Sequence, residues 1–263
     1  MFAQIVRGAI VERYQDINAK TIDRWVEEGW EWGKPVSHEE YIKATRGEWE
    51  VLLTPTVKVP KEWFGNNGDI RGKRILGLAS GGGQQMPIFT AAGAICTVLD
   101  YSSSQINSER MVAEREGYEI EIVQADMTEP LPFENESFDI IFHPVSNCYI
   151  EDVAAVFKEC ARVLKRGGVM LGGFDTEINY IVSSDEERLV NKMPFNPLVN
   201  AEQMRQLEED DAGVQFSHTV VEQIGGQLKA GLSLVDLYDD TNGEGRLHEL
   251  NIKTYIATKT IKL

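Results

Sequence analysis

The sequence predicts an α/β fold in which a mostly parallel sheet is covered by helices on both faces. Between residues 72 and 174, short apolar runs alternate with segments of helical pattern, as in parallel strands joined by helical crossovers. The apolar runs are nearly continuous, which is typical of strands buried on both faces. A glycine-rich loop follows the first run, at the strand end where such sheets bind ligands.

The predicted strands of this region are short apolar runs, at residues 74–79, 94–100, 120–126, 138–144 and 169–174. The helices between them have helical apolar spacing or a terminal glycine, at residues 84–93, 102–116 and 153–168. Serines 102–104 are candidate N-caps of the second helix. Three consecutive glycines, residues 81–83, follow the first strand. Because glycine tolerates positive φ and has no Cβ, they indicate either close approach to a ligand or a tight structural turn.

Residues 1–70 are predicted to form an N-terminal helical cap. Apolar residues recur there at helical intervals, at Ile10, Tyr14, Ile17, Ile22, Trp25 and Val26. A second helix is expected to begin at Ser37, which forms a capping-box pattern with Glu40. Prolines in residues 53–64 predict an extended connector. We interpret the tryptophans of this zone either as a lid over a pocket or as packing anchors: Trp25, Trp30, Trp32, Trp49 and Trp63.

Residues 71–263 are expected to form the main domain, with an insertion at 175–216 that is too long for a plain connector. We expect this insertion to cover the strand ends and to complete a substrate pocket with Tyr180, Phe195 and Asn196; partial disorder near residues 183–188 is the alternative. The tail predicts a helix over 219–231, strands over 232–240 and 251–261, and a glycine-rich turn between those strands. His218 is expected in the first turn of the helix, capped by Ser217.

Composition narrows the classes of function. The formal net charge is −16, so the basic surface of a nucleic-acid binder is not expected. We find no apolar window long enough for a membrane span and no signal-peptide pattern in the first twenty residues. The three cysteines have no metal-ligand spacing and an odd count, which predicts no disulfide framework and a reducing, cytoplasmic location. No clustered histidine and acid pattern calls for a metal.

Two classes of ligand compete for the glycine loop. A nicotinamide dinucleotide would need a G-x-G-x-x-G pattern with an acid about 20 residues further on, and Gly81, Gly83 and Asp100 satisfy part of it. Met86 occupies the third glycine position, where a long side chain hinders the close packing of helix on strand. The pattern therefore weakens the prediction of an NAD(P)-dependent oxidoreductase.

Several segments, taken in order, resemble the class I S-adenosylmethionine-dependent methyltransferases over residues 72–174. "ILGLASGGG" (75–83) is similar to the first motif of that family, "VLD" (98–100) to the end of its second strand, and "QADMTEPLPFENESFDIIF" (124–142) to the segment that leads into the fourth strand. "VLKRGGVML" (163–171) is similar to its turn into the fifth strand. The resemblance implies a Rossmann-like, seven-stranded twisted sheet with an antiparallel last strand between its partner and the fifth strand.

The same resemblance implies a binding site for S-adenosyl-L-methionine and its product S-adenosyl-L-homocysteine. Asp100 would accept hydrogen bonds from the ribose hydroxyls, and Asp126 would take the adenine amino group with the Met127 backbone beside the base. The implied cofactor-binding residues are Ala79, Ser80, Gly81, Gly82, Gly83, Gln84, Gln85, Asp100, Tyr101, Asp126, Met127 and His143.

The first motif departs from the family pattern at two positions. Gly77 stands where an acid is usual and Ala79 stands where a glycine is usual. We therefore expect the ammonium group of the cofactor to be held by backbone carbonyls and by polar side chains of the loop, the nearest being Ser80, Gln84 and Gln85.

Such an enzyme aligns a nucleophile of a small molecule with the sulfonium methyl for direct in-line transfer, excludes water and removes a proton where needed. The candidate catalytic residues follow the fourth strand, at His143, Asn147 and Tyr149. The alternative for His143 is plain packing beside Pro144. Cys148 is interpreted as a small buried filler, and a non-catalytic module that binds the cofactor as a sensor remains open.

Overall fold

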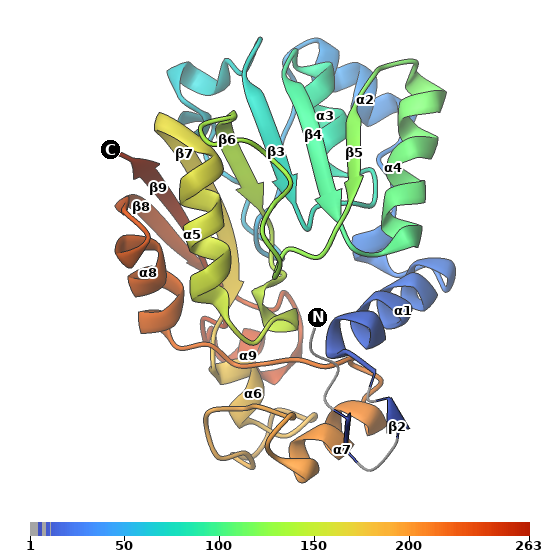
Figure 1. Cartoon of the computed structure of the whole chain (residues 1–263), viewed down its shortest axis with the longest axis vertical. Coiled ribbons are helices and arrows are strands. Elements are labelled where there is room, and N and C mark those ends of the chain that lie inside the picture. Colours follow the sequence, from blue (N-terminus) through green and yellow to red (C-terminus); the bar gives the residue numbers. More distant parts are fainter. Residues whose placement is uncertain (1–4, 7–8, 11) are drawn as a thin grey trace.

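The computed structural model describes residues 5–6, 9–10 and 12–263. A seven-stranded sheet has the order β5-β4-β3-β6-β7-β9-β8 (Figure 1). Its strands are β3 (Arg74–Leu78), β4 (Ile95–Asp100), β5 (Glu121–Gln124), β6 (Phe138–His143), β7 (Leu164–Asp175), β8 (Leu232–Asp240) and β9 (Tyr255–Lys262). Strands β3 to β7 pair in parallel, and β9 pairs antiparallel with both β7 and β8. The predicted place of the last strand, between its partner and the fifth strand of the alternating region, is confirmed.

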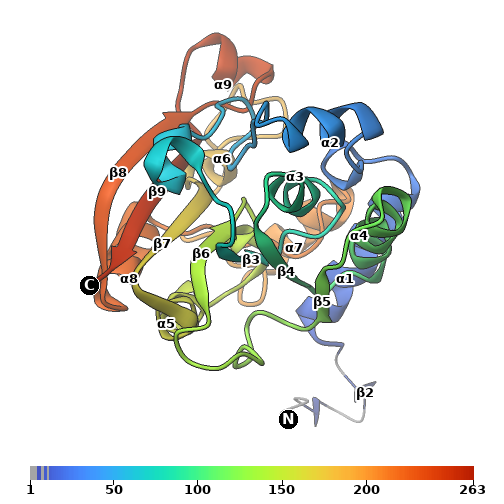
Figure 2. The same ribbon diagram turned by 90° about the horizontal axis from the view of Figure 1, so that it is seen from above.

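The helices are α1 (Tyr14–Glu27), α2 (His38–Thr45), α3 (Gln85–Ala91), α4 (Ser103–Glu116), α5 (Val153–Val163), α6 (Ile178–Ile181), α7 (Ala201–Glu209), α8 (Val220–Lys229) and α9 (Gly245–Glu249). Short 3-10 turns lie at Glu31–Gly33, Lys61–Phe64, Asn66–Gly68 and Asn147–Tyr149. Helices α2 and α3 lie on one side of the sheet, and α5 and α8 lie on the other (Figure 2). The sequence-based prediction of helices on both faces is confirmed.

Each face of the sheet has its own apolar core. On the side of α3, Phe89 packs with Trp49 and Phe142 among other fully or nearly fully buried side chains. On the side of α5, Phe157 packs edge-on against Phe174 of β7. Burial of each large apolar side chain stabilises the folded state by about 2 kcal/mol. Because both faces of the sheet carry such a core, the strand ends are held in fixed relative positions.

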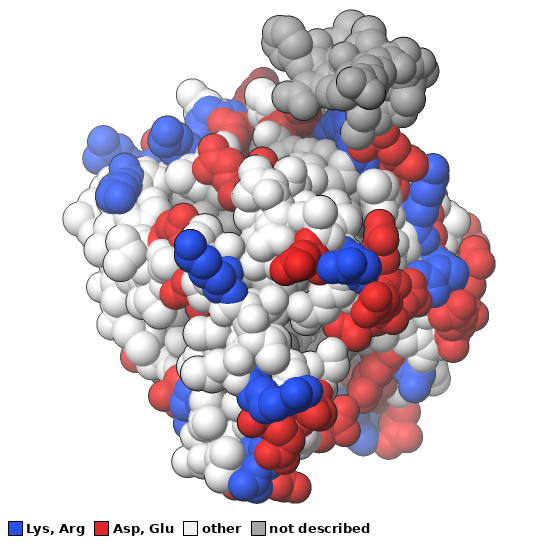
Figure 3. Space-filling view, turned by 90° about the horizontal axis from the view of Figure 1, so that it is seen from below, with Lys and Arg blue, Asp and Glu red and all other residues white. Residues whose placement is uncertain are grey.

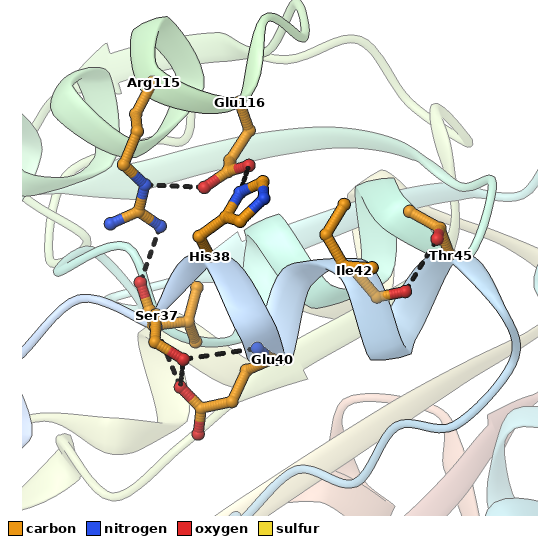
Figure 4. A network of polar contacts seen from close by, with 8 residues as sticks. Ser37, His38, Glu40, Ile42, Thr45, Arg115 and Glu116 are labelled. Atoms are coloured by element: carbon orange, nitrogen blue, oxygen red, sulfur yellow. Dashed lines mark hydrogen bonds and ion pairs between the residues drawn. The ribbon is translucent and has the colours of Figure 1, made fainter.

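Helix α2 begins as its sequence predicts and is tied to α4 (Figure 4). The Ser37 Oγ accepts from the Glu40 N–H at 3.2 Å, and the Glu40 carboxylate accepts from the Ser37 N–H at 2.8 Å. This capping box satisfies early donors of the helix. On α4, Arg115 pairs with Glu116, whose other oxygen lies 2.7 Å from His38 Nδ1. The N-terminal cap is thereby fastened to the main domain.

The carboxyl ends of β3, β4, β5, β6 and β7 lie at one edge of the sheet, below it in Figure 1. Helices α1, α6 and α7 lie at this edge, so the N-terminal cap and the 175–216 segment meet there. Figure 3 views the molecule from this side, where basic groups alternate with acidic ones. Within the described residues, no helix is long and apolar enough to cross a bilayer.

Four local predictions are wrong. Ile10 lies in the short strand β2 (Ala9–Ile10), which pairs with β1 (Ile5–Val6), and the first helix begins only at Tyr14; the remaining residues before 12 lie outside the described part. Helix α5 ends at Val163, because the chain from Leu164 onward already pairs with β6. Helix α8 is capped by Thr219, whose Oγ1 accepts from the Glu222 N–H, so His218 lies before the helix. The last strand, predicted from residue 251, begins only at Tyr255, because helix α9 follows the predicted glycine turn and pairing with β7 and β8 starts at Tyr255.

Candidate functional site

A cavity of about 480 Å³ lies at the carboxyl ends of the parallel strands, within the usual size range of ligand pockets. The glycine loop after β3, the ends of β4 and β7, and the segments after β5 and β6 all contribute to its wall. One face of α1 closes it from the N-terminal side through residues spaced three or four apart, Gln15, Asn18, Ala19, Ile22 and Trp25.

The three glycines of the loop are required by its packing against α4 and β4. A Cβ on Gly81 would lie 2.8 Å from Gln105 Cβ and 2.9 Å from Asp100 Oδ2. Gly82 and Gly83 have φ of +90° and +68°. Gly81 lines the cavity, whereas Gly82 and Gly83 face α4. All three glycines therefore serve the tight packing of the loop, and Gly81 is the one that lines the cavity, where close approach to a ligand stays a prediction.

Two buried carboxylates hold the loop in place. Asp100 accepts from the Gly81 N–H at 2.9 Å and from the Ser102 N–H at 3.0 Å. Glu109 of α4, which is 0% exposed, accepts from the Gly83 N–H at 3.0 Å. Burial raises the pKa of Asp100, and it raises the pKa of Glu109 to about 7, against the opposing effect of these backbone donors. Asp100 lines the cavity, and Glu109 supports the loop from behind.

Asp126 and Met127 line the cavity next to Asp100, on the neighbouring strand end. Asp126 Oδ1 accepts from the Thr128 N–H at 2.8 Å and from the Thr128 hydroxyl at 2.7 Å. Its Oδ2 pairs with Arg13, which directly precedes α1. The two carboxylates predicted from the strand ends are therefore brought together in one cavity.

Helix α1 is hydrogen-bonded to the segment that follows β4. Asp23 accepts from the hydroxyls of Ser102 and Ser103 at 2.5 and 2.7 Å and from the Ser104 N–H at 2.9 Å. Asp16 accepts from the Tyr101 hydroxyl at 2.6 Å. These bonds hold one wall of the cavity against the residues beside Asp100.

Some of the five tryptophans lie where a lid over the pocket would lie, and the others are packing anchors. Trp25, Trp30 and Trp32 line the cavity, and the rings of Trp25 and Trp30 are in contact at 5.3 Å between centroids. Trp49 and Trp63 are buried in the core on the α3 side of the sheet. The prediction of a lid therefore applies to the first three and that of packing anchors to the last two.

Another part of the cavity is lined by groups from β7, α6 and β9, from the turn after β6 and from the segment before α8. They are Tyr149, Asp175, Asn179, Tyr180, Gln215 and Tyr255. Asp175 is the last residue of β7 and is 4% exposed. Its Oδ2 accepts from the Tyr180 hydroxyl at 2.5 Å. This part of the cavity is polar and aromatic, and it is enclosed partly by the 175–216 segment.

The structure does not bring His143 and Asn147 to the cavity wall, although the sequence placed them there. Both side chains are 0% exposed. His143 Nδ1 lies 3.0 Å from the Leu78 carbonyl, its Nε2 lies 2.8 Å from the Asn147 amide, and Asn147 contacts Gln223 of α8 at 2.8 Å. Burial lowers the pKa of His143, so the ring is neutral. This chain of hydrogen bonds joins β6 to α8 and corrects the assignment of His143 as a candidate base and cofactor contact.

Some of the other predicted site residues line the cavity, and others do not. Of the implied cofactor-binding residues, those that line the cavity are Ala79, Ser80, Gly81, Gln84, Gln85, Asp100, Tyr101, Asp126 and Met127. Phe195 is buried against Tyr180, and Asn196 donates to Glu151 at 3.0 Å, so both support the wall from outside. His218 Nε2 lies 2.9 Å from the Ile150 carbonyl and does not reach the cavity.

Several cavity residues were not identified by the sequence analysis, among them Gln105 and Asp175. Gln105 lies behind the glycine loop, and its buried Oε1 has no hydrogen-bond partner among the described residues. Asp175 follows an apolar strand directly, and the same signal identified Asp100. In the described part of the chain, no group of three or more His, Cys, Asp or Glu residues has the arrangement of a metal site.

Comparisons with known proteins agree with this geometry. A family model described as a methyltransferase domain matches residues 76–172. The uncharacterized methyltransferase YbaJ of Bacillus subtilis (strain 168) is 39% identical over 253 residues, which cover 94% of this chain and 97% of YbaJ. A ubiquinone biosynthesis O-methyltransferase of Nitrosococcus oceani is 31% identical over 107 residues, 41% of this chain and 45% of that enzyme. The crystal structure of an S-adenosylmethionine-dependent methyltransferase from Mesorhizobium loti matches 73% of this chain and 92% of its own, with a TM-score of 0.59 at 17% identity.

Proposed function

Because the chain belongs to the class I S-adenosylmethionine-dependent methyltransferases, we propose that it binds S-adenosyl-L-methionine in the cavity and transfers the methyl group directly to a small molecule held beside it. The observation that carries this proposal is the meeting of Asp100 and Asp126 in one cavity at neighbouring strand ends. The concave shape and the aromatic wall of the cavity favour a small molecule over a macromolecular acceptor.

The residues present fit the nucleoside part of the cofactor. Each Asp100 oxygen has one backbone donor and retains a lone pair, so the carboxylate is fixed and still able to accept from two ribose hydroxyls. Asp126 and Met127 would hold the adenine on the adjacent strand end. Gln105 lines the cavity beside Gly81, and its Cβ lies 2.8 Å from the position that a Cβ on Gly81 would take.

The departure of the first motif from the family pattern has a physical counterpart. A Cβ on Gly77 would lie 2.7 Å from the Met86 sulfur, so Met86 fills the space that an acid at position 77 would need. We infer that polar groups of the loop replace that acid, with Ser80 and Gln85 held together by a 3.0 Å hydrogen bond.

The cofactor supplies a methyl group already activated by its sulfonium charge. The protein is left to bind the acceptor, to align it and to keep water out. Helix α1 with Trp25 and Trp30 would close one side of the cavity, and the 175–216 segment with Tyr180 would close the other. We therefore propose that the 175–216 segment is a substrate lid. The cytoplasmic location expected from the cysteine content stays a prediction.

Calorimetry with S-adenosyl-L-homocysteine tests the binding site. Wild-type protein is expected to bind, and Asp100→Ala is expected to lose about 1 to 3 kcal/mol of binding free energy through two charge-assisted hydrogen bonds. Asp139→Asn is the matched control, because Asp139 accepts from the Arg74 N–H at the opposite end of the sheet. Absence of binding to the wild-type protein rejects the assignment.

Transfer itself is tested with methyl-labelled S-adenosyl-L-methionine and a small-molecule extract of cells. Label is expected to enter a product of low molecular mass, and the Asp100→Ala variant is expected to transfer at least about ten-fold less at limiting cofactor. Binding of the cofactor without any transfer would instead favour a sensor.

A further inference from the structure

Asp175 is a buried carboxylate that the cofactor site does not use. It is the last residue of β7, it lines the cavity and it is 4% exposed. Asp100 is the last residue of β4, and β3 and β6 lie between the two strands. At about 4.8 Å per strand, β4 and β7 are separated across the sheet by about 14 Å. Asp175 therefore belongs to the acceptor end of the cavity.

The hydrogen bonds of Asp175 are incomplete. Its Oδ2 accepts from the Tyr180 hydroxyl, whereas its Oδ1 has no partner among the described residues. A buried carboxylate oxygen without a donor costs free energy, and native structures rarely keep one unless a ligand completes it. Tyr180 also donates to Gln215, so the hydroxyl is already shared.

The charge of Asp175 is likewise uncompensated. The titratable groups that face it are Cys148, Tyr149, Tyr180 and Tyr255, all neutral near pH 7 because burial and nearby negative charge raise their pKa values. Within the part of the chain that the structure describes, no cationic side chain acts on Asp175, and burial raises its pKa to about 6. The carboxylate is mostly ionised at neutral pH and has no counter-ion.

We propose that Asp175 is the binding carboxylate for the methyl acceptor and that this acceptor is an amine that enters as its ammonium cation. An ammonium group supplies both the missing donor to Oδ1 and the missing positive charge, whereas a neutral hydroxyl supplies only the donor. The tyrosines around Asp175 add aromatic surface, which favours a cation over a neutral group. The formal charge of −16 attracts such a substrate over a longer range.

Methylation of this amine balances as follows. The ammonium nitrogen passes one proton to the Asp175 carboxylate and becomes a neutral nucleophile. Its lone pair then forms the new nitrogen–carbon bond while the carbon–sulfur bond breaks and leaves its electron pair on the sulfur. The product is a methylated ammonium and a neutral thioether, and Asp175 returns its proton to water. This inference rests on the proposed function and adds the acceptor class to it.

The test uses two probes of the same shape, 2-phenylethylamine and 2-phenylethanol, titrated separately into protein saturated with S-adenosyl-L-homocysteine at pH 7.5. Wild-type protein is expected to bind the amine at least about ten-fold more tightly than the alcohol, because a charge-assisted hydrogen bond is lost in the alcohol. Asp175→Asn keeps the shape of the side chain and removes its charge. The affinities of this variant for the two probes are expected to lie within about two-fold of each other. Asp239→Asn, at an exposed site on β8 outside the cavity, changes the net charge equally and should keep the preference.

The pH dependence gives a second readout. An alkylammonium stays protonated at pH 5, whereas Asp175, with its pKa raised to about 6, becomes neutral, so the preference for the amine should fall between pH 7 and 5. A urea denaturation curve checks that Asp175→Asn is folded, and loss of an uncompensated buried charge predicts no loss of stability.

The inference is overturned if the amine binds no better than the alcohol in wild-type protein, or if the preference survives in Asp175→Asn. It is also overturned if Asp175→Asn loses about ten-fold in affinity for S-adenosyl-L-homocysteine, since the carboxylate would then hold the cofactor. Failure of the proposed function is read separately, from a titration of wild-type protein with S-adenosyl-L-homocysteine and no probe.

Discussion

Replacement of Gly81 by alanine is expected to damage both stability and cofactor binding. Its Cβ would lie 2.8 Å from Gln105 Cβ and 2.9 Å from Asp100 Oδ2, and neither neighbour is a free side-chain end. Overpacking of a fixed site costs about 1 to 3 kcal/mol. The shift would also move the Gly81 N–H that holds Asp100, so we expect affinity for S-adenosyl-L-homocysteine to fall at least about ten-fold.

Two variants are matched controls. Ala79 has a φ of +48°, a conformation that costs alanine about 1 kcal/mol, so Ala79→Gly should range from no change to about 1 kcal/mol more stable. At Gly225 in α8 a Cβ would meet only Val221 Cγ1 at 3.6 Å, an ordinary contact. Gly225→Ala should therefore stabilise the protein by about 0.5 to 1 kcal/mol.

The assay is urea denaturation followed by tryptophan fluorescence. With a slope of about 2 to 3 kcal/mol per molar urea, a loss of 2 kcal/mol lowers the midpoint by about 0.7 to 1 M. Equal midpoints for Gly81→Ala and Gly225→Ala would refute the steric argument. A Gly81→Ala protein that is less stable yet binds S-adenosyl-L-homocysteine normally would refute the coupling between the loop and Asp100.

Three further predictions concern other parts of the molecule. Asn18 accepts from the Val214 N–H at 2.6 Å and donates to the Val214 carbonyl at 2.9 Å, so Asn18→Ala should cost about 2 kcal/mol in urea denaturation through two lost hydrogen bonds. Burial raises the pKa of Glu109 from 4.5 to about 7, so its contribution to stability is full below pH 4.5 and is lost as pH rises through 7. Glu109→Gln should remove that slope from a pH series of unfolding free energies, and an unchanged slope would contradict the assigned pKa. A thiol reagent at pH 8 should label no cysteine of the folded protein within minutes, because burial raises the pKa of each buried thiol, Cys96, Cys148 and Cys160.

The meeting of Asp100 and Asp126 in one cavity was predictable because its signals are local. Asp100 is the last residue of β4, Asp126 comes two residues after β5, and parallel strands place their carboxyl ends at one edge. His143 occupies a similar position and still misses the cavity. Ile140 and Phe142 of β6 face the core under α3, so alternation turns His143 toward the opposite core, where it meets Phe174. Both faces of this strand are apolar, and the pattern gives no sign of which face a side chain takes.

The contacts made by α1 were not predictable, because they depend on tertiary structure. Asp16 and Asp23 read as ordinary solvated acids on a helix, whereas the structure joins them to Tyr101 and to the serines after β4. Asn18 likewise finds partners almost two hundred residues away in the chain. No local pattern reports such partners, and only the concentration of tryptophans before the glycine loop suggested that the N-terminal zone covers a pocket.

These contacts couple the docking of α1 to the binding of the ligand. Asp23 holds the serine next to Asp100, and Arg13 holds Asp126, so undocking of α1 would loosen the two side chains proposed to grip the nucleoside. Coupling of this kind is reciprocal in free energy: a bound nucleoside must disfavour the undocked helix by the same free energy by which undocking of the helix weakens nucleoside binding. The rate of amide hydrogen exchange in residues 14–27 should then fall when the ligand binds, although those amides do not contact it.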